Sequence, residues 1–257
     1  PANKKVMVTF WTVVGKDRAE VESYHSQLNH PDSCQRQMTL SWTRSQVQTR
    51  HCGLSLSDAA NVQKIAGYLL YPERYLRMPS ETIAQGMGSQ SALWPMAISG
   101  DFPIFALRIA DVADIEIVAQ ALRYQEYMRA RGLLADLVIV NEQASTYVQD
   151  LQQAIENLCE NSRLRGREYG PRQHIFAVRR DLMDQHSYRT LLAVARIVLH
   201  TRNGTIFDQI ERAEAAIIQE RETHAVEVVK PADSAKTSLP VVRQPRKPAR
   251  EAAPADG

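Results

Sequence analysis

The chain has few cysteines, no long apolar run and almost no net charge. Its three cysteines, Cys34, Cys52 and Cys159, are far apart and form no CxxC pair. This excludes a disulfide scaffold and favours buried thiols in a reducing compartment. No stretch approaches the roughly 18 consecutive apolar residues that a membrane helix requires, so we expect no membrane span. The formal charge of +2 is too small to predict a nucleic-acid partner or a membrane surface.

The composition is that of a folded chain, except at its end. With 257 residues, 44% of them hydrophobic and 23% charged, the chain can form one large domain or two small ones. Residues 223–257 depart from this average because they hold five prolines and no aromatic residue. We therefore predict a disordered, basic, Pro-rich linker there. Contact of these basic residues with nucleic acid or lipid is the less favoured alternative.

The first residues predict a strand without a partner. Val6 to Val14 is a run of β-branched and aromatic residues, which is typical of a strand. A lone strand has nothing to pair with in the sequence that follows. We therefore expect residues 1–14 to be the last strand of a sheet whose other strands lie upstream in a longer protein.

Residues 15–85 are predicted to be a helical segment. Asp17 can cap a helix over 17–29, which ends at His30-Pro31, and a second helix is expected over 33–51. A third helix, starting at Ser55 or Ser57 and ending before Pro72, has the clearest apolar stripe of this region. We expect the third helix to bury that stripe.

Residues 86–222 alternate between short apolar runs and helical stripes. The runs at 102–109, 137–140 and 174–178 are continuously apolar, which indicates strands buried on both faces. Helical stripes are predicted between and after them, and a final packing helix is expected. These stripes lie at 115–131, 147–158, 188–199 and 206–221. The sequence therefore predicts an α/β fold with a small three-stranded parallel sheet and crossover helices.

Polar residues at the carboxyl ends of these strands are the candidate ligand-facing groups, because open α/β sheets bind ligands at this edge. The alternative, which we favour, is that they cap helices and satisfy turn amides. These residues are Arg108, Asp111, Asn141, Glu142 and Arg179 to Asp181.

Other motifs fail their structural requirements. Gly86 to Ser91 lacks the preceding strand, the following helix and the third glycine of a dinucleotide fingerprint. His25 and His30 have no third donor at metal-ligand spacing. A nucleophile elbow needs glycine two positions before and two positions after the serine, where Ser99 has Ala97 and Asp101. Asp101 itself has no carboxyl partner nearby in sequence. We therefore predict no catalytic residue, no metal site and no cofactor.

Five phrases of the sequence together resemble a known family. They are Leu40 to Gln48 with Arg50-His51, Tyr68 to Pro72, Gln90 to Pro95 running into Ile98 to Ile104, Asp136 to Glu142, and Tyr147 to Gln152. They look like the bacterial cyclic β-1,2-glucan synthase, a very large membrane-bound glycosyltransferase whose soluble part is similar to glycoside phosphorylases. The resemblance covers about residues 6 to 220. Ala97 stands where the family often has glycine, which puts the local turn in doubt.

The resemblance implies a connecting segment. It would place residues 1–14 at the end of one phosphorylase-type β-sandwich and the whole chain before a second sandwich. The catalytic segments of the family lie elsewhere, so it assigns no catalytic residue here. The implied partners are the adjoining domains of the same synthase, and β-1,2-glucan is a further candidate. The implied location is the cytoplasmic face of the bacterial inner membrane, as a soluble part of a membrane-bound enzyme.

The leading hypothesis is thus a non-catalytic connecting module of a cyclic β-1,2-glucan synthase. Trp94 and Trp42 are its candidate glucan contacts, because sugar CH faces stack on flat aromatic rings, although core packing is the favoured expectation for both. The alternative is a free-standing carbohydrate-active enzyme that uses Glu142 or Asp111 at the strand ends. A third hypothesis is nucleic-acid binding by the basic residues from 230 onward.

Overall fold

A computed structural model describes residues 8–86, 88–144, 149–165 and 174–229. The chain divides into two compact units, Pro1–Ala215 and Ala216–Gly257. The described part of the second unit is the continuation of helix α8 (Ile206–Val229). The sheet, its cores and the candidate sites described below belong to the first unit. The boundaries predicted at residues 15, 86 and 223 as domain borders stay predictions.

The predicted helical segment is confirmed in its three helices, α1 (Arg18–Leu28), α2 (Ser33–His51) and α3 (Leu56–Leu70). Each begins where the capping residues indicate. The side chain of Asp17 accepts a hydrogen bond from the Glu20 amide at 2.9 Å. Ser55 and Asp58 form a reciprocal capping box at the start of α3. A further helix, α4 (Ser80–Gln85), was not predicted.

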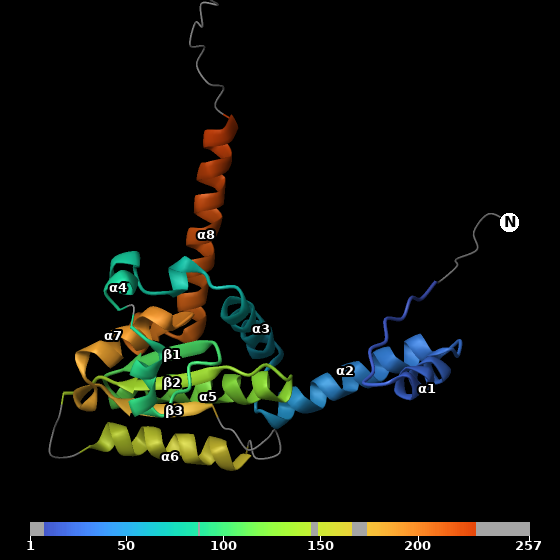
Figure 1. The fold of residues 1–257 in the computed structure, drawn as a ribbon, viewed down its shortest axis with the longest axis horizontal. Coiled ribbons are helices and arrows are strands. Elements are labelled where there is room, and N and C mark those ends of the chain that lie inside the picture. Colours follow the sequence, from blue (N-terminus) through green and yellow to red (C-terminus); the bar gives the residue numbers. More distant parts are fainter. Residues whose placement is uncertain (1–7, 87, 145–148, 166–173, 230–257) are drawn as a thin grey trace, which may run out of the picture. The chain divides into compact units, whose positions relative to one another are not determined.

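The sheet has four parallel strands, so the prediction of three is wrong by one. The strands are β1 (Ile104–Ile109), β2 (Asp136–Asn141), β3 (Ile175–Arg179) and β4 (Ile197–His200). Their order across the sheet is β3-β2-β1-β4. Helices α5 (Ile115–Ala130), α6 (Asp150–Arg165) and α7 (Gln185–Val194) connect successive strands (Figure 1). The α/β class with parallel strands and crossover helices is confirmed.

The missed strand lies inside the helix predicted over 188–199. Leu191, Leu192 and Ala195 have helical spacing, and the following apolar residues extend the same stripe in the sequence. In the structure α7 ends at Val194, and the amide of Arg196 donates to the Ile104 carbonyl at 2.9 Å. Residues 197–200 then pair with β1. The free ladder edge of β1 decides this conformation, and that edge exists only once the sheet has formed.

Alternate side chains of the strands form two cores, one on each face of the sheet. Phe105, Leu107 and Ile109 of β1 pack with buried residues of α3, α5 and α6 and with the first turns of α8. Ile104 and Ala106 face the other way and pack with Leu93, Ile98 and residues of α7. The continuous apolar runs of the sequence follow from this burial on both faces.

Gly86 and Gly88 pack against α7 and do not form a nucleotide-binding turn. A Cβ atom added at Gly86 would overlap the carbonyl of Arg189, and one at Gly88 would overlap the hydroxyl of Thr190. Close helix packing therefore accounts for both glycines. After them, residues 90–96 form a short 3₁₀ helix.

Two further expectations concern the ends of the chain. Residues 8–14 belong to no helix or strand; their role in an upstream sheet stays a prediction, since a strand needs a neighbour to complete its ladder. Residues 223–229, which were predicted to be disordered, are helical, because α8 continues to Val229. Residues 230–257 lie outside the described residues. In the described part of the chain, no helix has the length and apolar character needed to cross a membrane.

Candidate functional site

The sheet topology places a switch point between β1 and β4. β1 is joined through α5 to β2 on one side, whereas β4, which comes last in the chain, pairs with β1 on the other side. Ligands of open α/β sheets bind at such points, beyond the carboxyl ends of the strands. Arg108 of β1 and His200 of β4 are register partners there, and Glu142 directly follows β2.

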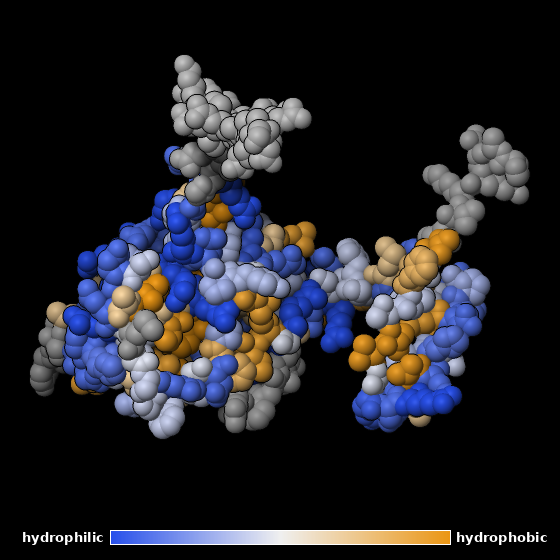
Figure 2. All heavy atoms as spheres, turned by 45° about the horizontal axis from the view of Figure 1, so that its top comes forward, coloured by the Kyte–Doolittle hydropathy of each residue, from blue (hydrophilic) through white to orange (hydrophobic). Residues whose placement is uncertain are grey.

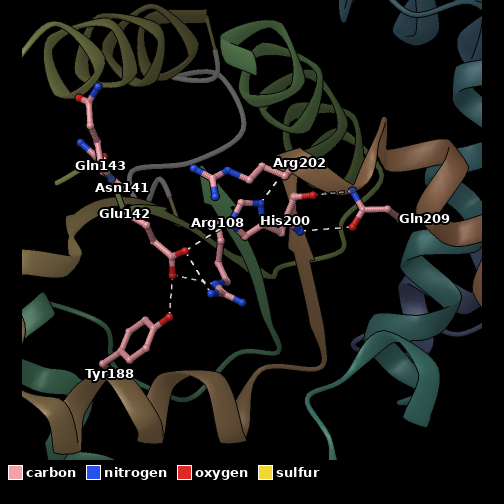
Figure 3. A network of polar contacts seen from close by, with 8 residues as sticks. All are labelled: Arg108, Asn141, Glu142, Gln143, Tyr188, His200, Arg202 and Gln209. Carbon is pink, nitrogen blue, oxygen red and sulfur yellow. Dashed lines mark hydrogen bonds and ion pairs between the residues drawn. The ribbon is translucent and has the colours of Figure 1, made fainter. Parts of the chain in front are cut away.

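Glu142 is the centre of a polar network at this edge (Figure 3). Arg108 donates from Nε to Glu142 Oε1 at 2.7 Å and from Nη2 to Oε2 at 3.1 Å. The Tyr188 hydroxyl donates to Oε1 at 2.6 Å, and His200 Nε2 lies 3.4 Å from Oε2. The side chains of Arg108 and Glu142 are 25% and 14% exposed. The network thus connects β1, β2, β4 and α7 in a partly dehydrated environment.

The charges of the network stabilise one another. Burial opposes ionisation of Glu142, but the hydrogen bonds from Arg108 and Tyr188 outweigh it and lower the pKa of the carboxyl. Burial likewise opposes the charge of Arg108, yet the bond to Glu142 leaves its pKa raised. Burial and the bond to Glu142 raise the pKa of Tyr188 to about 12. Arg180 lies over the Tyr188 ring, with Cζ 4.1 Å from its centroid.

His200 is held as a neutral imidazole by its contacts. Burial, followed by the charge of Arg108, lowers its pKa. Its Nδ1 accepts a hydrogen bond from the Arg202 amide at 3.0 Å, which leaves the proton on Nε2, facing Glu142. Gln209 fixes the backbone at this point, because its side chain accepts from the His200 amide and donates to the His200 carbonyl.

This arrangement leaves Glu142 little capacity for proton transfer. A carboxylate has about four acceptor positions, and each of its two oxygens has two partners here. A general base needs a free lone pair near the operating pH, and a general acid needs a raised pKa. Glu142 has neither property. The geometry is that of a structural link between the ends of neighbouring strands.

Asp111, Asn141, Arg179 and Asp181, which were also predicted for this edge, do not join the network. Asp111 is exposed and accepts from the Ala113 amide at 2.9 Å, so it caps a short 3₁₀ helix. Asn141 is buried, donates to Gln152 Oε1 and accepts from the Gln143 amide. Arg179 pairs with Asp181 on the far side of β2. Of the predicted set, Arg108 and Glu142 form the network, and Arg180 contacts it through the Tyr188 ring.

Sequence reasoning missed Tyr188 and His200. Tyr188 was assigned to the apolar stripe of a helix, and that helix was extended through the strand that carries His200. A histidine after a run of β-branched residues was the available signal. It becomes informative only when β4 is placed beside β1.

Trp94 and Trp42 are both surface residues, so the favoured expectation of core packing is wrong for both. Trp94 lies in the 3₁₀ helix and is 63% exposed, and Trp42 lies on α2 and is 66% exposed. Both side chains therefore contact solvent over most of their surface. Their role as glucan contacts stays a prediction.

Trp42 belongs to an exposed apolar surface, which we call the arm surface. It is formed by residues 8–14 and the outer face of α2, and it surrounds an open hollow of about 850 Å³. Figure 2 shows apolar atoms gathered on this part of the chain. Its most exposed apolar members are Val8, Phe10, Val14, Met38 and Trp42. Solvent-exposed apolar groups in this number mark an interaction surface.

The described residues bring no three His, Cys, Asp or Glu side chains into a cluster that could hold a metal ion. Cys52 and Cys159 are buried and Cys34 is half-buried. Burial raises the pKa of the Cys159 thiol to about 11, so this cysteine is a poor nucleophile near neutral pH.

No protein-family model matches the chain. The cyclic β-(1,2)-glucan synthase NdvB of Rhizobium meliloti (strain 1021) is 51% identical over 244 residues. These residues are 95% of this chain but 8% of the synthase. The chain is thus similar to one segment of this synthase. The resemblance noted in the sequence is therefore confirmed, for a segment that spans a small part of its relative.

Proposed function

We propose that this chain is a non-catalytic connecting module that supports cyclic β-1,2-glucan synthesis by positioning adjoining domains of a synthase. The observation that carries the proposal is the match of 95% of the chain to one segment of such a synthase at 51% identity. Glu142 supports the non-catalytic role, because each oxygen of its carboxylate already has two partners in the polar network at the switch point.

The arm surface supports the connecting role. Phe10 is 90% exposed and Trp42 is 66% exposed, and burial of such side chains against a partner is favourable by about 25 cal/mol for each Å² of apolar area. A neighbouring domain of the same polypeptide can cover this surface without loss of translational freedom on each encounter. We therefore assign adjoining synthase domains as the partner of the arm surface.

An assay of the purified chain separates this role from catalysis. The chain is incubated with a nucleotide sugar, UDP-glucose, and separately with β-1,2-glucan and phosphate. We expect no product above the buffer control. Turnover by the chain alone would overturn the proposal and would support a free-standing carbohydrate-active enzyme, the second candidate.

The second candidate is favoured by one observation, the Arg108–Glu142–Tyr188–His200 cluster at a switch point. The variant Glu142→Gln tests this second candidate. If Glu142 were a general acid or base, Glu142→Gln would lower any turnover by about 10²- to 10⁴-fold in a folded chain. The connecting role predicts that a synthase with Glu142→Gln in this segment retains its turnover per folded molecule.

The arm surface is tested in a full-length synthase that contains this segment. Trp42→Asp should lower the glucan yield and increase proteolysis between domains, because the carboxylate opposes burial of the surface. Leu182→Asp is the matched control, since Leu182 is 74% exposed and lies outside the arm surface. Equal behaviour of the two variants would contradict the assignment.

A further inference from the structure

The opposite, amino-terminal edge of the sheet contains a hollow that the network of Glu142 does not use. It has a volume of about 430 Å³, within the range of about 300–1,000 Å³ typical of small-molecule pockets. Its lining combines acids, a histidine, a hydroxyl and aromatic rings. The polar members and the rings are Ser99, Asp101, Asp136, His174, Phe102 and Phe176.

Asp136 is the feature that points to a ligand. Its side chain is 1% exposed, and its Oδ1 lies 2.7 Å from His174 Nδ1. Its Oδ2 is buried and has no hydrogen-bond partner in the described part of the chain. A buried carboxylate oxygen without a partner loses its hydration and gains nothing in return, so it requires an explanation. Asp136 is one of the residues that line the hollow.

The surrounding side chains and backbone hold this acid in place. The Asp136 amide donates to the Pro103 carbonyl, and the Leu137 amide donates to the His174 carbonyl. Phe102 packs edge-on against the His174 ring, with centroids 4.6 Å apart. His174 itself has a φ of +51°, a left-handed conformation that costs a residue other than glycine about 1–3 kcal/mol. The site is therefore rigid and built at an energetic cost.

The second acid of the hollow, Asp101, is positioned by the loop that also carries Ser99. Gln90 donates from Nε2 to the Ser99 carbonyl at 2.7 Å and to Asp101 Oδ1 at 3.2 Å. The loop turns through left-handed conformations at Ala97 and Gly100. One phrase that carries the family resemblance, Gln90 to Pro95 running into Ile98 to Ile104, is thus held together by these hydrogen bonds beside the hollow.

The chemistry of the lining selects a neutral, hydroxyl-rich ligand. Among the residues that the structure describes, no Lys or Arg lines the hollow, so an anion there would meet the carboxyl groups of Asp101 and Asp136. Burial, followed by the charge of Asp101, raises the pKa of Asp136 against the opposing effect of His174. A hydroxyl group can donate to an ionised carboxyl and accept from a protonated one, so it suits either state of Asp136. Apolar rings pack well against the CH faces of a sugar.

We propose that this hollow binds one glucose unit of a β-1,2-glucan, with Asp136 Oδ2 and Asp101 as partners of its hydroxyl groups and Phe102 against its CH face. The choice of this sugar rests on the proposed function. The site lies at the opposite edge of the sheet from Glu142 and involves no bond-breaking step. Its role is to hold glucan on the module while other domains act on it.

The test is a calorimetric titration of the full chain with sophorose, the β-1,2-linked glucose disaccharide. We expect Asp136→Asn to weaken binding at least tenfold, because the amide nitrogen that replaces Oδ2 cannot accept a hydroxyl proton. Asp101→Asn, on an exposed residue that does not affect the core, should weaken binding to a smaller extent. Asp111→Asn is the matched control, because it removes a carboxylate at the other edge and should leave binding unchanged.

The outcomes are decisive in each direction. Absence of sophorose binding to the wild-type chain, or equal binding by folded Asp136→Asn, would overturn the site. Equal affinity for cellobiose, the β-1,4-linked isomer, would overturn the β-1,2-glucan assignment. The proposed function fails separately, through turnover by the isolated chain, and that result would leave an Asp136-dependent sugar site standing.

Discussion

Removal of the Glu142 carboxylate should destabilise the α/β unit strongly, although the residue lies at the edge of the sheet. Glu142→Ala leaves the Arg108 guanidinium without its counter-ion and the Tyr188 hydroxyl without its acceptor. Breaking a fully buried ion pair from one side costs about 3–5 kcal/mol. The two side chains retain 25% and 14% exposure, so solvent recovers part of this cost. We expect a loss of about 2–4 kcal/mol in the free energy of unfolding.

Matched variants separate the contributions. Tyr188→Phe removes one hydrogen bond and leaves the ion pair, so it should cost about 1–2 kcal/mol. Glu116→Ala is the control, because Glu116 pairs with Arg123 at 2.9 Å but is 79% exposed. Exposed pairs contribute about 0–1 kcal/mol. A double-mutant cycle between Glu142→Ala and Tyr188→Phe should give a clear coupling energy, since both act on the same oxygen.

Urea denaturation followed by circular dichroism measures these differences. A Glu142→Ala midpoint within error of the Glu116→Ala midpoint would refute the reasoning, because it would mean that the network contributes no more than a surface ion pair. A large loss of stability together with unchanged turnover of a synthase that carries the variant would support the structural role.

The pH dependence of stability should have a defined sign. The pKa of Glu142 is lower in the fold than in the unfolded chain. Its contribution is therefore fully present above the ordinary glutamate pKa of about 4.3 and is lost as the pH falls through the lowered value. Wild type and Glu142→Gln should converge in stability on acidification. Divergence below pH 4 would contradict the lowered pKa.

Three further predictions follow from the packing. Gly88→Ala should lower the free energy of unfolding, because its Cβ would overlap a hydroxyl of α7. Gly67→Ala, in open space within α3, should raise the free energy of unfolding by about 0.5–1 kcal/mol. Equal effects of the two variants would contradict the close packing at Gly88. Burial raises the pKa of Asp136, so its contribution to stability is present below the ordinary aspartate pKa and is lost as the pH rises through the raised value. Asp136→Asn should flatten this part of a pH–stability profile. An unchanged profile would contradict the raised pKa. A thiol reagent at neutral pH should modify half-buried Cys34 before buried Cys159, whose pKa is raised to about 11, and mass spectrometry after partial reaction would show the reverse order if the burial is wrong.

The helices were predictable from the sequence because their signals are local. Asp17 and Ser55 cap their helices through hydrogen bonds to residues three positions away, and the apolar stripe of α3 is buried as its spacing indicates. The continuous apolar runs likewise identified β1, β2 and β3. The resemblance to the glucan synthase also came from the sequence alone, because it rests on short phrases such as Gln90 to Pro95.

The strand β4 and both edges of the sheet depended on tertiary structure. Residues 197–200 fit a helical stripe in isolation and become a strand because β1 offers an unpaired edge. The same pairing brings His200 to Arg108 and Glu142, residues 34 to 92 positions apart in the sequence. The Asp136–His174 pair forms only when β2 and β3 align. Local periodicity determined the elements, whereas long-range pairing decided which polar side chains meet, because no short-range signal encodes a distance across the sheet.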